Sequence, residues 1–244
     1  MKKFELTAEF ATNIFEKKLF RIKALVAFGN VGKGELGGFV EKEENLSQNG
    51  NAWVSGNAKV YGNAEVYGDA VVSGNAEVYG NAEVYGDAVV YGGAVVSGNA
   101  VVSGNAKVSG NAKVSGNAEV SDGAKVSGNA EVSDGAVVSG NAEVSGNAEV
   151  YGGAVVSGNA EVYGNADYAT VKGFGRYYRT TTFFRCNDKI LRVQCGCFYG
   201  DLTQFHEIVK KTHGDSKRAK EYLAIADLME LHFSDEEEKQ EVSE

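Results

Sequence analysis

The hexapeptide Gly62-Asn63-Ala64-Glu65-Val66-Tyr67 is one unit of a repeat that covers residues 50–169 without an insertion or deletion. Twenty units follow one another; all keep Ala in the third place, and nineteen keep Val in the fifth. A period of six with one small and one aliphatic residue is typical of a parallel β-helix, in which three units close a triangular coil. The repeat therefore predicts a mainly β fold, a triangular solenoid of six to seven coils.

The position within the unit decides which side chains are buried. Neighbouring strand residues point to opposite faces, so Ala64 and Val66 should point inward while Glu65 and Tyr67 point outward. Residues eighteen positions apart should lie above one another. This spacing stacks Tyr61 on Tyr79 and Tyr67 on Tyr85, and it places Trp53 at the head of a column that continues through Val71 and Val89.

The second place of the unit holds Asn in fourteen repeats, Asp in two and Gly in four. These three residue types tolerate a positive φ better than most others. We therefore expect the second place to be a left-handed corner, with the preceding Gly keeping the turn free of a Cβ clash.

The segments on either side of the repeat should cap the open ends of the solenoid. Residues 1–49 are expected to form a β-rich N-terminal cap, with strands over 4–6 and 19–26 and an irregular first coil from about Leu36. Residues 170–233 are expected to form a small α+β domain, in which a hairpin over 180–186 and 190–195 precedes two helices, 202–212 and 217–233. The acidic tail, 234–244, has little to bury and is predicted to be disordered.

Charge and composition exclude several classes of function. The chain has a net charge of −9, and acidic residues outnumber basic ones in the repeat, which argues against binding duplex nucleic acid along the shaft. No apolar run is long enough to span a membrane, and no signal peptide is recognisable. Three cysteines without a secretory signal favour reduced thiols. We therefore expect a soluble protein of the bacterial cytosol.

The C-terminal domain carries most of the candidate ligand-binding residues. Basic residues that alternate with aromatic ones can hold anionic or nucleotide-like ligands by charge and stacking, although the same pattern also suits a solvated sheet face. The candidate ligand-binding residues are Arg176, Tyr177, Tyr178, Arg179, Arg185 and Arg192.

The three cysteines and one histidine of this domain are candidate metal ligands. Cys186, Cys195 and Cys197 flank the predicted hairpin and His206 lies in the next helix, a set that could form a Cys3His zinc site. The alternative is that these cysteines are ordinary core residues. Zinc is accordingly the one cofactor that the sequence suggests.

The fold also resembles a known family. The phrase Val60-Tyr61-Gly62-Asn63-Ala64-Glu65 looks like the aliphatic-first hexapeptide of left-handed β-helix proteins, which are dominated by acyltransferases. The resemblance implies a left-handed coil and a trimer. Acyltransferases of this family use a His as general base, whereas no repeat of this chain contains His. The fold alone therefore does not imply that activity.

The N-terminal flank and the first repeat resemble bacterial and phage hexapeptide-repeat proteins that carry a transferase label, and the C-terminal flank looks like a module that recurs on phage and prophage proteins. The N-terminal resemblance rests on residues 21–25, 34–41, 44–47 and 50–54, and the C-terminal one on 179–184, 195–198 and 221–224. The resemblance implies a phage or prophage context.

Outward-facing side chains of the shaft offer a second candidate surface. Stacked tyrosines and outward valines form apolar area that a monomer rarely leaves exposed as one patch. Oligomerisation through a flat face, a trimer above all, would cover it. The residues predicted for this surface are Tyr61, Tyr67, Tyr79, Tyr85, Val71 and Val89.

Three functions are compatible with these observations. The first is a non-enzymatic β-helical scaffold that presents its C-terminal domain to a host protein or a small anionic ligand, for example in an anti-defence role. The second is an acyltransferase with its active site at a subunit interface. The third is a rod-like structural protein that assembles end to end.

Overall fold

A computed structural model describes residues 1–175 and 177–234. The chain forms two compact units, Met1–Ala166 and Asp167–Glu244. The first unit contains the repeat and the N-terminal cap, and the second contains a small antiparallel sheet and two helices.

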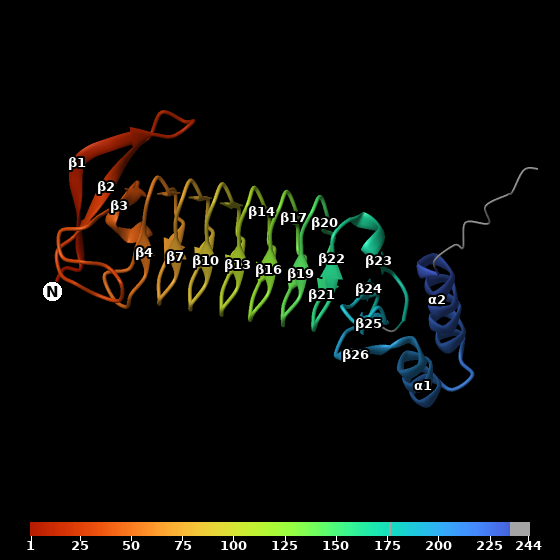
Figure 1. The fold of residues 1–244 in the computed structure, drawn as a ribbon. Helices are drawn as coiled ribbons and strands as arrows, with labels where there is room; N and C mark the ends of the chain where they lie inside the picture. Colours follow the sequence, from red (N-terminus) through yellow and green to blue (C-terminus); the bar gives the residue numbers. More distant parts are fainter. Residues whose placement is uncertain (176, 235–244) are drawn as a thin grey trace, which may run out of the picture. The chain divides into compact units, whose positions relative to one another are not determined.

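The repeat forms a parallel β-solenoid in which every hexapeptide contributes one two-residue strand (Figure 1). Successive strands lie on three different faces, and the pairing joins residues eighteen positions apart, as in Val71 with Val89. One face stacks seven strands, so the shaft has about seven coils. The predicted solenoid with three units per coil is therefore confirmed. The strands are β4 (Trp53–Val54), β5 (Lys59–Val60), β6 (Glu65–Val66), β7 (Val71–Val72), β8 (Glu77–Val78), β9 (Glu83–Val84), β10 (Val89–Val90), β11 (Val95–Val96), β12 (Val101–Val102), β13 (Lys107–Val108), β14 (Lys113–Val114), β15 (Glu119–Val120), β16 (Lys125–Val126), β17 (Glu131–Val132), β18 (Val137–Val138), β19 (Glu143–Val144), β20 (Glu149–Val150), β21 (Val155–Val156) and β22 (Glu161–Val162).

The interior of the shaft consists of the Ala and Val columns. Every third-place Ala and fifth-place Val in these strands' units, from Ala52 to Val162, is fully buried. Burial of a Val side chain contributes roughly 1.5 to 3 kcal/mol, so the stacked columns supply the driving force for coiling. The predicted inward and outward faces of the repeat are confirmed.

The left-handed corner lies one place earlier than the sequence analysis predicts. The first-place Gly adopts positive φ, as Gly98 does at +71°, and Asp122 and Asp134 do the same where they replace that Gly. The reason is the close approach between coils, because a Cβ on Gly98 would lie 2.9 Å from the backbone N and O of Gly116. The second-place Asn is therefore not the corner residue.

The second-place Asn side chains instead form hydrogen-bonded ladders along the outside of the shaft. Asn63 donates to Asn81, Asn81 to Asn99, and Asn99 to Asn117, with N–O distances of 2.9 to 3.2 Å. A second ladder joins Asn111, Asn129 and Asn147. Each ladder ties successive coils together outside the core.

The N-terminal cap extends one of the three sheets. Strand β1 (Phe4–Thr12) pairs antiparallel with β2 (Lys18–Ala24), and β2 pairs antiparallel with β3 (Leu36–Val40). Strand β3 then pairs in parallel with β5, which makes it the start of the first coil. The expected beginning of that coil near Leu36 is confirmed.

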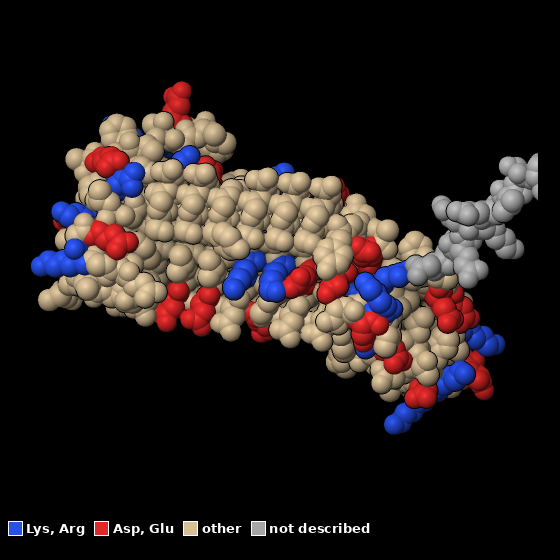
Figure 2. Space-filling view, viewed as in Figure 1, with Lys and Arg blue, Asp and Glu red and all other residues tan. Residues whose placement is uncertain are grey.

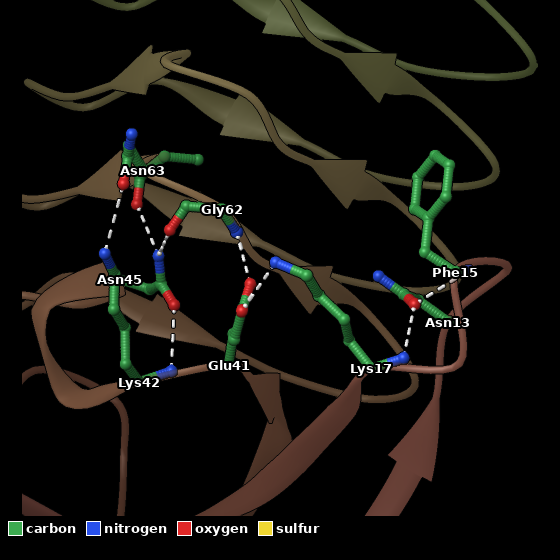
Figure 3. A network of polar contacts seen from close by, with 9 residues as sticks. Asn13, Phe15, Lys17, Glu41, Lys42, Asn45, Gly62 and Asn63 are labelled. Atoms are coloured by element: carbon green, nitrogen blue, oxygen red, sulfur yellow. Dashed lines mark hydrogen bonds and ion pairs between the residues drawn. The ribbon is translucent and has the colours of Figure 1, made fainter.

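A polar network fastens the cap to the first regular coil (Figure 3). The Glu41 carboxylate accepts hydrogen bonds from Lys17 Nζ at 2.9 Å and from the Gly62 amide at 2.7 Å. Burial acts to raise the pKa of Glu41, but these two donors outweigh it and hold the pKa below its ordinary value. Asn45, in the short 3-10 helix η1 (Glu43–Asn45), donates to the carbonyls of Gly62 and Ala64.

The twentieth hexapeptide does not form a coil of the shaft. Asp167 occupies the variable fourth place of this unit, and Tyr168 occupies the fifth place, where the other units have Val. A Tyr side chain is too large for a stack of Val side chains. The chain instead forms the 3-10 helix η2 (Asn165–Asp167) and then enters the second unit through β23 (Tyr168–Val171).

The second unit packs two helices with a four-stranded antiparallel sheet. Phe183 and Val193 from the sheet pack with Phe205 of the first helix and with Met229 and Phe233 of the second. The predicted hairpin and both helices are confirmed, whereas the outer strands were not foreseen. The elements are β23, β24 (Thr181–Arg185), β25 (Leu191–Cys195), β26 (Phe198–Asp201), α1 (Leu202–His213) and α2 (Lys217–Phe233).

Both helices begin where their capping residues predict. Asp201 accepts a hydrogen bond from the Gln204 amide, and Ser216 accepts one from the Ala219 amide. Within residues 1–175 and 177–234, neither helix is long and apolar enough to cross a membrane.

Candidate functional site

The predicted cluster of arginines does not form one surface. Arg185 donates to the Phe233 carbonyl at the end of α2, with an N–O distance of 2.6 Å. Arg192 forms a 2.6 Å ion pair with Asp188 in the hairpin turn. Both guanidinium groups therefore stabilise the fold of the second unit. Arg176 lies outside the described residues.

Arg179 and Tyr177 are exposed and lie together. The guanidinium carbon of Arg179 lies 5.1 Å from the centre of the Tyr177 ring, within the range of a cation–π contact. Within the described residues, the guanidinium has neither an ion pair nor a hydrogen bond. Tyr178 is also exposed and has a φ of +53°. Arg179 is thus the predicted arginine whose charge is available to a ligand.

A hollow of about 340 Å³ opens beside Arg179. This volume lies at the lower end of the range for small-molecule sites. The hollow combines a cation, two thiols, an imidazole and two phenols. The lining residues that supply these groups are Tyr177, Arg179, Cys195, Cys197, His213 and Tyr222.

A second, apolar hollow of about 170 Å³ adjoins the first. The two hollows are adjacent, since Cys195, Thr212, His213 and Tyr222 line both. The second hollow adds hydrocarbon and aromatic surface from Phe198, Phe205, Ile208 and Val209. We call the polar, cationic hollow the mouth and the apolar hollow the floor. We call the two hollows together the C-terminal pocket.

Tyr222 stands at the junction of the two hollows. Its ring stacks on His213 at a centroid distance of 5.9 Å and meets Phe205 edge to face at the same distance. Burial raises the pKa of the Tyr222 hydroxyl, and the neighbouring Cys195 thiol adds to the effect. Gly175 leaves room for this side chain, because a Cβ there would overlap the Tyr222 hydroxyl at 1.8 Å.

The predicted metal ligands do not converge. Cys195 pairs with Thr181 across the hairpin, whereas Cys186 follows the Arg185–Leu191 pair at the opposite end. Cys186 is buried, and its sulfur lies 3.8 Å from the Tyr199 hydroxyl. His206 faces Asp227 at 3.6 Å. Among the described residues, no three His, Cys, Asp or Glu side chains lie close enough to hold a metal ion.

Cys195 and Cys197 both line the pocket because Cys195 precedes a tight turn and Cys197 lies in it. Cys195 pairs with Phe198 at the end of the β25–β26 hairpin, so Gly196 and Cys197 form a two-residue loop. Gly196 has a φ of +60°, which suits the first central position of a type II′ turn. The Cys195 sulfur accepts a hydrogen bond from the Thr181 hydroxyl at 3.2 Å.

With this geometry established, comparison with known proteins adds information on the shaft. Residues 58–74 and 82–98 match the family model of the YdcK β-solenoid repeat. The chain is similar to this repeat. No curated protein matches the chain at a significant level. The match covers part of the shaft and lies outside the C-terminal pocket.

The tyrosines predicted for an oligomer surface stack in pairs. Tyr61 lies on Tyr79 and Tyr67 on Tyr85, with centroid distances of 4.9 and 4.8 Å and rings within 6° of parallel. Tyr61 is only 4% exposed because Leu19 and Phe39 of the cap pack against it. Tyr61 is therefore not available to an oligomer interface, contrary to the sequence analysis. Burial and the Glu77 carboxylate raise the pKa of Tyr61.

Other outward side chains of the shaft range from partly buried to exposed, and Tyr91, Tyr151 and Tyr163 are 43%, 54% and 51% exposed. Val71 and Val89 stack below Trp53 as predicted and are half-buried. Trp53 is 4% exposed, and Phe28 of the cap packs edge to face against it. In the view of Figure 2, a broad band of the shaft shows no Lys, Arg, Asp or Glu, and the charged side chains gather along its lower edge.

A further hollow of about 430 Å³ lies where the cap meets the first coils. It is lined by Glu35, Asn51, Trp53 and Asp69, among others. Two of its polar side chains have partners within the fold, since Asn51 donates to Asp69 and the Glu35 carboxylate accepts from the Gly32 amide. The buried indole N–H of Trp53 has no hydrogen-bond partner among the described residues.

Thr212, His213 and Tyr222 were missed as site residues. They flank the turn between the two predicted helices, and Gly214 ends α1 directly after His213. A short helix–helix turn brings the end of one helix close to the start of the next. That rule could have placed His213 and Tyr222 side by side from the sequence.

Proposed function

We propose that this protein is a non-enzymatic scaffold whose shaft presents a small-molecule site in the second unit. The observation that carries the proposal is the C-terminal pocket, where an unpaired arginine, two thiols, an imidazole and two phenols adjoin an apolar hollow. Along the shaft, Asn side chains form ladders by donating to the Asn of the next coil. A phage or prophage origin, an anti-defence use and assembly as a trimer belong to the proposal as implications of the family resemblance.

The distribution of histidine favours binding over acyl transfer. All three histidines lie in the second unit, His206 and His213 in α1 and His232 in α2. General-base catalysis requires a base within hydrogen-bond reach of the reacting group. The coils carry no histidine, the base that acyltransferases of this fold use, so the fold's family does not by itself supply an activity here.

Hydrogen–deuterium exchange on the full chain tests the proposal. The protein is mixed with the small-molecule fraction of a bacterial cytosol, and the exchange rates are compared with and without this fraction. Protection should be confined to peptides that contain Arg179, Cys195 or residues 212–222. Protection on the shaft alone, or no protection anywhere, would overturn the proposal.

A further inference from the structure

We propose that the C-terminal pocket binds a small monocarboxylate that carries an apolar or aromatic group. This inference rests on the proposed function and names the ligand class of the same site. The carboxylate would pair with Arg179 at the mouth, and the apolar group would fill the floor. The two hollows meet at Tyr222, which therefore contacts both parts of such a ligand.

The mouth selects an anion because of Arg179. Its guanidinium is exposed and lies over the Tyr177 ring, which also lines the mouth, and it has no carboxylate partner in the described residues. A planar guanidinium binds a carboxylate through two parallel hydrogen bonds, which adds geometric selectivity to charge. An amine or another cation would be repelled at this mouth.

The floor selects an apolar group. Phe205 and Val209 are buried with 2% and 4% exposure, and Phe198 and Ile208 complete the wall. The tilted rings of Phe198 and Phe205, with centroids 5.5 Å apart, present aromatic surface to a guest. The floor adds about 170 Å³ to the mouth, so a single ring or a short aliphatic chain matches the space.

Calorimetric titration of the full chain with 3-phenylpropionate tests the inference. We expect saturable binding at one site per chain. The alcohol 3-phenylpropanol lacks the charge and acetate lacks the apolar group, so each should bind at least about tenfold more weakly. Equal affinity for the acid and the alcohol would refute the role of Arg179.

Two substitutions locate the site. Arg179→Gln should weaken 3-phenylpropionate binding by about tenfold to a hundredfold, the value of a charge-assisted hydrogen bond. The control Lys189→Gln removes one positive charge from the turn at the opposite end of the hairpin and should leave the affinity unchanged. Thr212→Trp, at an exposed position of the rim, should abolish binding by filling the mouth.

The outcomes separate this inference from the proposed function. Failure of 3-phenylpropionate to bind in the millimolar range would overturn the ligand class. If the cytosolic small-molecule fraction still protected the pocket in hydrogen exchange, the proposed function would stand with a different ligand. If neither bound, both proposals would fail.

Discussion

Replacing Gly98 by Ala tests why the coils of the shaft pack as closely as they do. Gly98 has a φ of +71°, and a Cβ there would lie 2.9 Å from the backbone N and O of Gly116 in the next coil. Left-handed strain costs a non-glycine residue about 1 to 2 kcal/mol, and overpacking adds about 1 to 3 kcal/mol. We therefore expect Gly98→Ala to lower the free energy of unfolding by about 2 to 5 kcal/mol.

Two other glycines of the repeat separate these contributions. Gly152 has a φ of +66°, but a Cβ added there would meet no atom within 4 Å, so Gly152→Ala should cost only the backbone strain, about 1 to 2 kcal/mol. Gly135 has neither a positive φ nor a close neighbour. Gly135→Ala should be neutral or stabilising by about 0.4 to 1 kcal/mol, because it restricts the unfolded chain.

Urea unfolding followed by circular dichroism measures the three free energies. The expected order of destabilisation is Gly98→Ala, then Gly152→Ala, then Gly135→Ala. Equal losses for Gly98→Ala and Gly152→Ala would show that the coils do not approach closely at this corner. A loss at Gly135 as large as at Gly152 would show that the first place of the unit is not the left-handed one.

Three further predictions concern the cap, the ladders and the core. Burial lowers the pKa of Lys3 from 10.5 to about 8, so the unfolded chain binds more protons between these values. The free energy of unfolding should then rise by on the order of 1 kcal/mol between pH 8 and pH 10.5. Urea unfolding at a series of pH values measures this rise, and Lys3→Met should remove it. Asn99→Ala breaks two ladder hydrogen bonds and should lower the free energy of unfolding, measured by thermal unfolding, by about 1 kcal/mol. The control Asn105→Ala lies outside the described ladders and should lower it by less. Equal losses would refute the ladder's contribution. Val102→Ala should lower the free energy of unfolding by about 2 kcal/mol, because it removes fully buried methyl groups. The comparison is Val101→Ala at the outward position of the same strand, measured by chemical unfolding. An equal loss for the two variants would contradict the assigned faces.

The architecture of the shaft could be predicted because its period is regular. An Ala and a Val at fixed places of every unit leave one way to bury both, as the fully buried pair Ala64 and Val66 shows. The corner was misplaced because Gly and Asn both tolerate a positive φ. Only the contact between Gly98 and Gly116 in successive coils decides between them, and that contact is tertiary.

The second unit was predicted less completely because its contacts are not periodic. The hairpin and the capped helices carry local signals, such as the Asp201 cap. Strand β26 is short and contains Gly200, where the packing of Gln204 leaves no room for a Cβ, so its composition did not indicate a strand. The roles of Arg185 and Arg192 also depend on partners that only the folded unit brings close.

The site was predicted in part for the same reason. Tyr177, Arg179, Cys195 and Cys197 were recognised from their residue types, and the structure brings them to one pocket. The grouping of the cysteines with His206 as zinc ligands failed because Cys186 lies at the other end of the hairpin.

Native mass spectrometry of the full chain tests the central claim, that the second unit holds a small-molecule site. The wild-type protein, Thr212→Trp and the shaft control Ser115→Trp are each incubated with the small-molecule fraction of a bacterial cytosol. The account predicts one bound small molecule per chain on the wild type and on Ser115→Trp, and none on Thr212→Trp. A bound molecule that persists on Thr212→Trp, or none on any of the three proteins, would contradict it.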